Sequence, residues 1–374
     1  MANMLDYLDW RGDLTFQQSK FNEVDNLLIA QMCYAPFEGI VKEGMEGMLT
    51  VKEVADLYFE KYTLRKQKSM ESQQIRATGV LAKMAQSKRF KDCYLGFYVQ
   101  QTTEKQQFSA ITMDLGENCL YIAFRGTDNT LVGWKEDLTM CYASNIQSQK
   151  DAVEYLENIK GLYPKKKIYV GGHSKGGNLS VYAAVKCKKA YQKDILLVFN
   201  NDGPGFRKDI VESKEYMEML PKIRTIVPES SIVGMLLEHR EAYTIVRSTQ
   251  SGGMQHDATS WEVLGRHFIY LETVSDGSKK IDSTISAWIE DLTVEEKKYV
   301  VDAIFNVLMA AGFSTVTSIQ KEPLKNALAL VKEMKNLTPQ TKKYISTAVS
   351  MLVKEGNKTV RKAIPFPYED EEKG

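Results

Sequence analysis

The N-terminal part of the chain carries apolar side chains at helical spacing. Residues 24–33, 51–62 and 70–87 each repeat apolar positions three or four residues apart, which is the period of a helix that buries one face. Strand-like runs are absent from this part of the pattern. The sequence therefore predicts a mostly helical N-terminal head over residues 1–89.

Runs typical of strands follow the head. Residues 94–99, 108–113 and 119–124 read as strands, and Gly116-Glu117-Asn118 indicates a hairpin turn between the last two. Helical and strand patterns then alternate, with helices expected at 151–160, 177–191 and 208–219 and strands at 168–170, 195–199, 223–227 and 243–247. Such alternation predicts a mostly parallel sheet covered by helices on both faces, and the hairpins make it mixed. This is an α/β chain with the α/β-hydrolase pattern.

The pattern changes after residue 275. Thr293 and Glu296 are spaced as a capping box, and Pro339 is placed to begin a second helix. The capping box precedes apolar residues that share one helical face, namely Val300, Ile304, Val307, Leu308 and Ala311. We therefore predict an α/β-hydrolase domain over residues 1–275 and a helical C-terminal appendage with a loose tail over residues 276–374.

Composition and charge narrow the classes of function. The chain is 43% hydrophobic and 26% charged, and its net charge of +1 lacks the basic excess of a nucleic-acid-binding protein. No apolar run approaches the ~18 residues of a membrane span. The first residues do not read as a signal peptide. The five cysteines form no C-x-x-C pair, and the four histidines have no metal-ligand spacing. We expect a cytoplasmic protein without a nucleic-acid partner, an integral membrane segment, a cofactor or a metal.

One short stretch carries most of the chemical information. Gly172-His173-Ser174-Lys175-Gly176 follows a short apolar strand and opens a helical run. In that setting G-x-S-x-G predicts a nucleophile elbow, a sharp turn that presents the serine at the end of the sheet. The glycines remove Cβ atoms that would collide with the neighbouring strand and helix. Ser174 is therefore the candidate nucleophile.

A serine nucleophile needs a base, and the base needs a carboxylate to orient it. His256 lies in a glycine-rich loop after the last predicted strand, where a catalytic histidine would reach the carboxyl edge of the sheet. It is the candidate base. His239 and His267 lie in apolar surroundings and are interpreted as structural.

Two carboxylates compete for the role of the acid. Asp202 follows the predicted strand 195–199, and Glu229 follows the strand 223–227, so both stand at the mouth of the sheet. Asp202 is preferred and Glu229 is the alternative. Asp202 also precedes Gly203-Pro204, and a turn aspartate is the competing structural interpretation.

Acyl transfer places negative charge on the carbonyl oxygen, so two N–H donors should converge near Ser174. One candidate is the backbone N–H of Lys175. The other is the loop Arg125-Gly126-Thr127-Asp128, in which Thr127 could hold the loop or donate a hydrogen bond itself.

Three motifs together resemble the class 3, or fungal-type, lipases over residues 90–262. They are the run from Tyr121 to Thr127, Trp134-x-x-Asp137-Leu138, and the Gly-His-Ser-x-Gly-Gly elbow. The resemblance implies Ser174 as nucleophile, His256 as base and Thr127 as part of the oxyanion hole. The head resembles a bacterial lipase-like branch of the α/β-hydrolases without an assigned role.

The chain also departs from that family. Ser231-Ile232-Val233-Gly234 stands where class 3 lipases carry the acidic residue, which favours Asp202, placed like the acid of pancreatic-type lipases. Lys175 stands where the family usually has an apolar residue after the nucleophile. Its cation beside the oxyanion site would suit a substrate with an anionic group, but the preferred interpretation is a side chain that faces solvent. The segment after Trp134 is short for an extended lid, which disfavours interfacial action on bulk triglyceride.

The leading hypothesis is a serine hydrolase that cleaves a carboxylic ester of a small molecule or lipid through a Ser-His-acid triad and an acyl-enzyme. The rival hypothesis is a catalytically weak hydrolase scaffold that acts as a binding module, with the C-terminal helices available to a protein partner. Acyl preference is not legible in the sequence.

Overall fold

The chain divides into two compact units in the computed structural model. The first unit comprises Met1–Asp128 and Ser144–Ala287, and the second comprises Asn129–Ala143 and Trp288–Gly374. The predicted boundary between residues 275 and 276 stays a prediction. The structure describes residues 2–42, 48–103, 106–128, 130–140, 142–275, 293–310 and 339.

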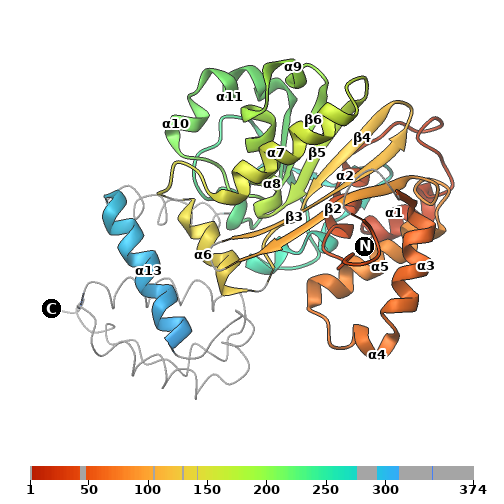
Figure 1. Cartoon of the computed structure of the whole chain (residues 1–374), viewed down its shortest axis with the longest axis horizontal. Helices are drawn as coiled ribbons and strands as arrows, with labels where there is room; N and C mark the ends of the chain where they lie inside the picture. Colours follow the sequence, from red (N-terminus) through yellow and green to blue (C-terminus); the bar gives the residue numbers. More distant parts are fainter. Residues whose placement is uncertain are drawn as a thin grey trace. The chain divides into compact units, whose positions relative to one another are not determined.

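A mixed sheet runs through the first unit (Figure 1), and among the described residues it has nine strands in the order β1-β2-β3-β4-β5-β6-β7-β8-β11. Strands β4 to β8 are parallel neighbours, and the flanking pairs are antiparallel. This confirms the predicted mixed, mostly parallel sheet of an α/β-hydrolase. The strands are β1 (Leu49–Thr50), β2 (Tyr94–Thr102), β3 (Gln107–Gly116), β4 (Cys119–Phe124), β5 (Lys167–His173), β6 (Ile195–Asn201), β7 (Ile223–Pro228), β8 (Tyr243–Val246) and β11 (Tyr270–Leu271).

The predicted hairpin between β3 and β4 is present. Its turn residues Gly116, Glu117 and Asn118 have φ values of 75°, 48° and 61°. Left-handed backbone is favourable for glycine and tolerated by asparagine, which explains why this tripeptide turns the chain. A separate two-stranded ribbon joins β9 (Val263–Leu264) and β10 (His267–Phe268).

Helices pack against both faces of the sheet, and strand β4 shows how its residues divide between them. Leu120, Ile122 and Phe124 belong to one buried cluster, while Tyr121 and Ala123 belong to the other. This alternation is the period of a strand covered on two sides.

The head supplies the helices of the first cluster, and the crossovers between parallel strands supply those of the second. The head contains α1 (Met4–Arg11), α2 (Glu23–Met32), α3 (Val51–Lys61), α4 (Leu64–Gln67) and α5 (Ser72–Gln86). The crossovers contain α7 (Gln147–Leu162), α8 (Lys175–Lys186), α9 (Lys189–Gln192), α10 (Lys208–Val211) and α11 (Lys214–Met219).

The second unit contains α6 (Leu131–Thr139) and α13 (Val294–Ala310), which pack against each other. The predicted capping box begins α13, because the Thr293 N–H donates to Glu296 and the Glu296 N–H donates to Thr293. Lys135 of α6 pairs with Asp302 of α13 at 2.8 Å. The helix predicted to start at Pro339 lies, apart from that residue, outside the described residues.

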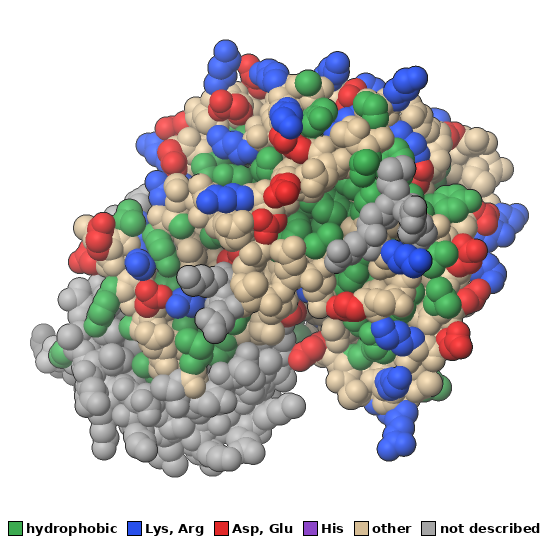
Figure 2. Space-filling model, in the orientation of Figure 1, with side chains coloured by type: hydrophobic (Ala, Val, Ile, Leu, Met, Phe, Trp, Pro, Cys, Tyr) green, Lys and Arg blue, Asp and Glu red, His purple; other side chains and the backbone are tan. Residues whose placement is uncertain are grey.

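Charges of both signs are interspersed on the face that Figure 2 shows, as the net charge of +1 leads one to expect. None of the helices in the described part of the chain combines the length and the apolar character that crossing a membrane requires.

A buried ion pair fixes the start of the head. The Arg89 Nε and Nη2 atoms donate to the two Asp25 carboxylate oxygens at 2.6 and 2.5 Å, and neither side chain is exposed. Arg89 Nη1 also donates to the backbone carbonyls of Leu14 and Ser19, while the Tyr7 hydroxyl donates to Asp25. One guanidinium thereby holds the loop between α1 and α2 against the rest of the head.

Replacing Arg89 with Met leaves the Asp25 carboxylate buried without its cation. We expect the free energy of unfolding to fall by about 3–5 kcal/mol, measured by urea denaturation. The double variant Arg89→Met/Asp25→Leu removes both charges and should recover part of that loss. An Arg89→Met protein as stable as wild type would contradict this view of the head.

Candidate active site

The serine of the elbow occupies a strained turn between β5 and α8. Ser174 has φ 58° and ψ −134°, a backbone conformation that residues with a side chain rarely adopt. Its N–H donates to the Asn201 carbonyl on β6 at 2.9 Å, and its carbonyl accepts from the Gly177 N–H at 2.8 Å. The neighbouring strand and the first turn of the helix together hold the strain.

Two glycines make this turn possible. A Cβ atom on Gly172 would lie 2.4 Å from the Phe124 carbonyl oxygen and 2.4 Å from the backbone of Gly176. A Cβ atom on Gly176 would lie 2.1 Å from the same Phe124 oxygen. Strand β4, strand β5 and helix α8 therefore meet at distances that only glycine permits.

Three predicted residues are linked by hydrogen bonds. His256 Nδ1 lies 2.7 Å from Asp202 Oδ2, and His256 Nε2 lies 3.1 Å from Ser174 Oγ. A carboxylate only accepts, so Nδ1 carries the proton and Nε2 accepts from the Ser174 hydroxyl. Asp202 is fully buried, whereas 24% of the His256 side chain is exposed.

The second oxygen of the Asp202 carboxylate is also held. Oδ1 accepts from the Ser231 hydroxyl and from the Gly234 N–H at 3.2 Å. Ser231 and Gly234 belong to the segment where the resemblance to class 3 lipases led us to expect an acid. Here that segment holds a carboxylate that comes from the end of β6. The sequence did not indicate this role of Ser231.

Glu229, the alternative acid, makes different contacts. Its carboxylate accepts from Gln255 Nε2 at 3.2 Å, and Gln255 also donates to the Gln250 carbonyl. The Trp261 indole N–H donates to the carbonyl of Gln255 at 2.9 Å. Glu229 therefore contacts the loop that carries His256, while Asp202 contacts the His256 ring.

The predicted oxyanion loop lies against the elbow. A Cβ atom on Gly126 would lie 3.1 Å from Ser174 Cβ, which places this turn beside the serine side chain. Thr127 is buried, and the Asp128 N–H donates to Gln107 Oε1 at 3.2 Å. Lys175 follows the serine as the first residue of α8, where the helix dipole favours negative charge.

The expectation that the Lys175 side chain faces solvent is wrong. Only 1% of Lys175 is exposed, and its Nζ donates to the Gln107 carbonyl at 2.8 Å. The physical reason is that every residue of α8 from Lys175 to Val185 is buried. A lysine in the first turn of such a helix must satisfy its ammonium group inside the protein.

The two other candidate histidines make contacts elsewhere. His239 Nδ1 lies 3.1 Å from Glu241 Oε1 inside the protein. Burial raises the pKa of Glu241, but hydrogen bonds and charge from His239, with hydrogen bonds from Thr225 and Tyr216, outweigh it and lower this pKa to about 2. His267 is half exposed, and one of its ring nitrogens lies 3.4 Å from the Tyr270 hydroxyl.

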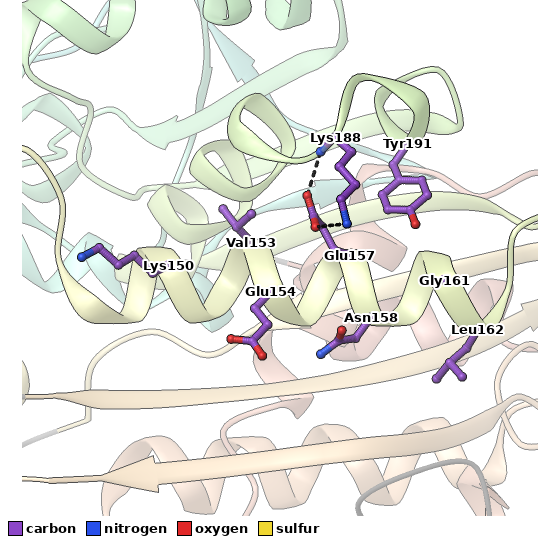
Figure 3. A pocket seen from close by; sticks show the side chains of 9 residues that line it. All are labelled: Lys150, Val153, Glu154, Glu157, Asn158, Gly161, Leu162, Lys188 and Tyr191. Atoms are coloured by element: carbon purple, nitrogen blue, oxygen red, sulfur yellow. Dashed lines mark hydrogen bonds and ion pairs between the residues drawn. The ribbon is translucent and has the colours of Figure 1, made fainter.

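A surface groove lies away from these residues, along α7 and α9 (Figure 3). Its carboxylate Glu157 already pairs with the Lys188 ammonium at 2.9 Å and accepts from the Lys188 backbone N–H at 2.8 Å. None of the residues that line it belongs to the elbow, the His256 loop or the oxyanion loop. Among the described residues, moreover, no group of three or more potential ligands could hold a metal ion.

The sheet order and the elbow define an α/β-hydrolase fold. Residues 84–306 match the Mbeg1-like family, which is more than half of the 374 residues, and the chain belongs to that family.

Similar solved structures include fungal lipases, the group that the sequence motifs resemble. A fungal lipase–inhibitor complex is 19% identical with a TM-score of 0.32, and the match covers 41% of this chain and 66% of that one, just under two thirds. The Rhizomucor miehei lipase propeptide complex is 15% identical with a TM-score of 0.35, covering 58% and 79% of the two chains.

Part of the chain is also similar to a protein that is not a lipase. The β subunit of an ADP-forming succinate–CoA ligase from Acidobacterium capsulatum is 25% identical over 118 residues, or 30% of this chain. The match spans 28% of that relative.

Replacing Gly172 with Ala should disrupt the elbow, because the new Cβ would overlap the Phe124 carbonyl and the Gly176 backbone. We expect a loss of about 1–3 kcal/mol in the free energy of unfolding, measured by thermal and urea denaturation. Gly79→Ala is the control, since Gly79 is exposed within α5 and a Cβ there meets nothing within 4 Å. That variant should gain up to about 1 kcal/mol. Equal stability of the two variants would contradict the packing argument.

Proposed function

We propose that this chain is a serine hydrolase that cleaves a carboxylic ester through an acyl-enzyme intermediate. The observation that carries the proposal is the continuous series from Asp202 through His256 to Ser174, with hydrogen bonds of 2.7 and 3.1 Å. A serine on a strained elbow, in hydrogen-bond reach of an imidazole that a buried carboxylate orients, is the arrangement that nucleophilic acyl transfer requires.

The reaction follows from the roles of these groups. Ser174 Oγ attacks the ester carbonyl while His256 Nε2 takes its proton, and the imidazolium formed is stabilised by the Asp202 carboxylate. His256 then gives that proton to the leaving alkoxide, and Ser174 keeps the acyl group. Water attacks the acyl-enzyme with His256 again as base, which releases the carboxylic acid and restores Ser174.

Charge on the carbonyl oxygen is the second requirement. The backbone N–H of Lys175 belongs to the first residue of α8, and the Gly126 turn, which Thr127 follows, lies beside the Ser174 side chain. We assign these two positions to the oxyanion hole, since donors fixed at a helix start and in a tight turn need no rearrangement as charge develops. The substrate is an ester of a small molecule or of a lipid.

A panel of 4-nitrophenyl esters with graded acyl length tests the proposal. Wild type should hydrolyse at least one member, and Ser174→Ala should reduce turnover to the level of buffer while its thermal unfolding stays cooperative. A folded wild-type protein without activity on any ester favours the rival hypothesis of a binding scaffold.

The same assay distinguishes between Asp202 and Glu229 as the acid of the triad. Asp202→Asn should lower kcat by about 10³–10⁴-fold, because an amide cannot stabilise the imidazolium and favours the wrong tautomer. Glu229→Gln is the matched control and should stay within about threefold of wild type, since it changes a single contact with Gln255. The opposite ranking of the two variants would assign the acid to Glu229.

A further inference from the structure

The ring of His173, the residue before the nucleophile, faces the base and not solvent. His173 Nε2 lies 2.8 Å from the backbone carbonyl oxygen of His256, and 3% of the residue is exposed. The two imidazole rings lie with centroids 4.6 Å apart and planes inclined by 35°. The backbone of the base is therefore bonded to the residue next to the nucleophile.

The hydrogen-bond partners determine the state of this ring. A carbonyl oxygen only accepts, so Nε2 of His173 carries a proton and its N–H donates a hydrogen bond to the His256 carbonyl. Nδ1 then accepts in the neutral ring, and the Tyr34 hydroxyl lies 3.2 Å from it. Burial, followed by the neighbouring His256, lowers the pKa of His173 well below its usual value, so the ring is neutral.

The same tyrosine contacts the oxyanion loop. A Cβ atom on Gly126 would lie 2.2 Å from the Tyr34 hydroxyl oxygen, 2.4 Å from the His173 carbonyl oxygen and 3.1 Å from Ser174 Cβ. Tyr34 follows α2 in the head, so a residue distant in sequence meets the elbow and the Gly126 turn at one point. Its ring also contacts the His173 ring edge to face, with centroids 6.1 Å apart.

Resting on the function proposed above, we propose that Tyr34 and His173 form a neutral hydrogen-bonded relay that positions the His256 loop and the Gly126 turn relative to Ser174. His173 is a positioning residue: it acts through the backbone of His256 and exchanges no proton with the substrate. Its neutrality matters because catalysis charges the adjacent His256 ring, and a second positive ring at this distance would oppose that charge.

Two neutral amide substitutions of His173 test the relay, because their side-chain nitrogens extend to different distances from the backbone. In Gln the side-chain nitrogen lies as many bonds from Cβ as Nε2 does in histidine, so His173→Gln can still donate to the His256 carbonyl. In Asn the nitrogen corresponds to Nδ1 and falls short of that carbonyl. We expect His173→Asn to lower kcat about tenfold and His173→Gln less than about threefold, with KM within about twofold in both.

Tyr34→Phe supplies an independent variant. It removes the donor to His173 Nδ1 and keeps the ring that packs there. We expect kcat to fall about threefold. In the His173→Asn background the same change should add little, because both residues act through one chain of contacts. Full additivity of the two losses would overturn the relay, and Tyr34→Phe carries the test if His173→Asn does not fold.

A readout that does not require turnover separates this inference from the proposed function. Hydrogen–deuterium exchange of the peptide over residues 252–260 should be faster in His173→Asn than in wild type and close to wild type in His173→Gln. If wild type hydrolyses esters, and His173→Asn and His173→Gln both have its kcat and its exchange rate over residues 252–260, the relay is wrong and the proposed ester hydrolase stands. If wild type is inactive, the proposed function fails and the exchange rates alone decide whether His173 holds the loop.

Discussion

The tight turn at Ser174 depends on the absence of side chains where β4, β5 and α8 meet. In the parallel register Phe124 lies beside Gly172, and its carbonyl oxygen occupies the space that a Cβ on Gly172 or Gly176 would need. This close approach fixes the direction in which β5 ends and α8 begins. Ser174 adopts a positive φ at that point, and the surrounding strand and helix hold this strained backbone in place.

The Asp202 carboxylate is positioned by residues that follow two different strands. Asp202 leaves the end of β6 with φ 52°, and its N–H donates to the Ile226 carbonyl on β7. Ser231 and Gly234, which follow β7, then hold its second oxygen. The segment that lacks an acid in its own sequence thus contributes donors to an acid supplied by the neighbouring strand. Such an exchange is possible because the carboxyl ends of β6 and β7 lie at the same edge of the sheet.

Local patterns were sufficient to predict much of the fold. The Gly116-Glu117-Asn118 turn and the capping box of Thr293 and Glu296 each involve residues a few positions apart, so their chemistry is legible in the sequence. The two-residue strand β1 (Leu49–Thr50) was missed because it exists only through pairing with β2. Short strands carry no periodicity of their own.

The contacts of the candidate site that the sequence could not predict are those between residues far apart in the chain. The order of Ser174, Asp202 and His256 along the chain suggested a triad, but whether Asp202 or Glu229 reaches His256 depends on how two loops fold. The burial of Lys175 follows from the position of α8 within the first unit, which a single lysine does not reveal. Tyr34 and His173 are 139 positions apart, and no local signal links them.

Covalent trapping of the nucleophile shows whether Ser174 is an activated serine. A fluorophosphonate probe reacts covalently with an activated serine, and mass spectrometry of the digested protein locates the adduct. We predict a single adduct on Ser174 in the folded wild-type protein and none in Ser174→Ala. A folded wild-type protein that carries no adduct, or carries it on another residue while Ser174 stays unmodified, would contradict the assignment of Ser174 as the nucleophile.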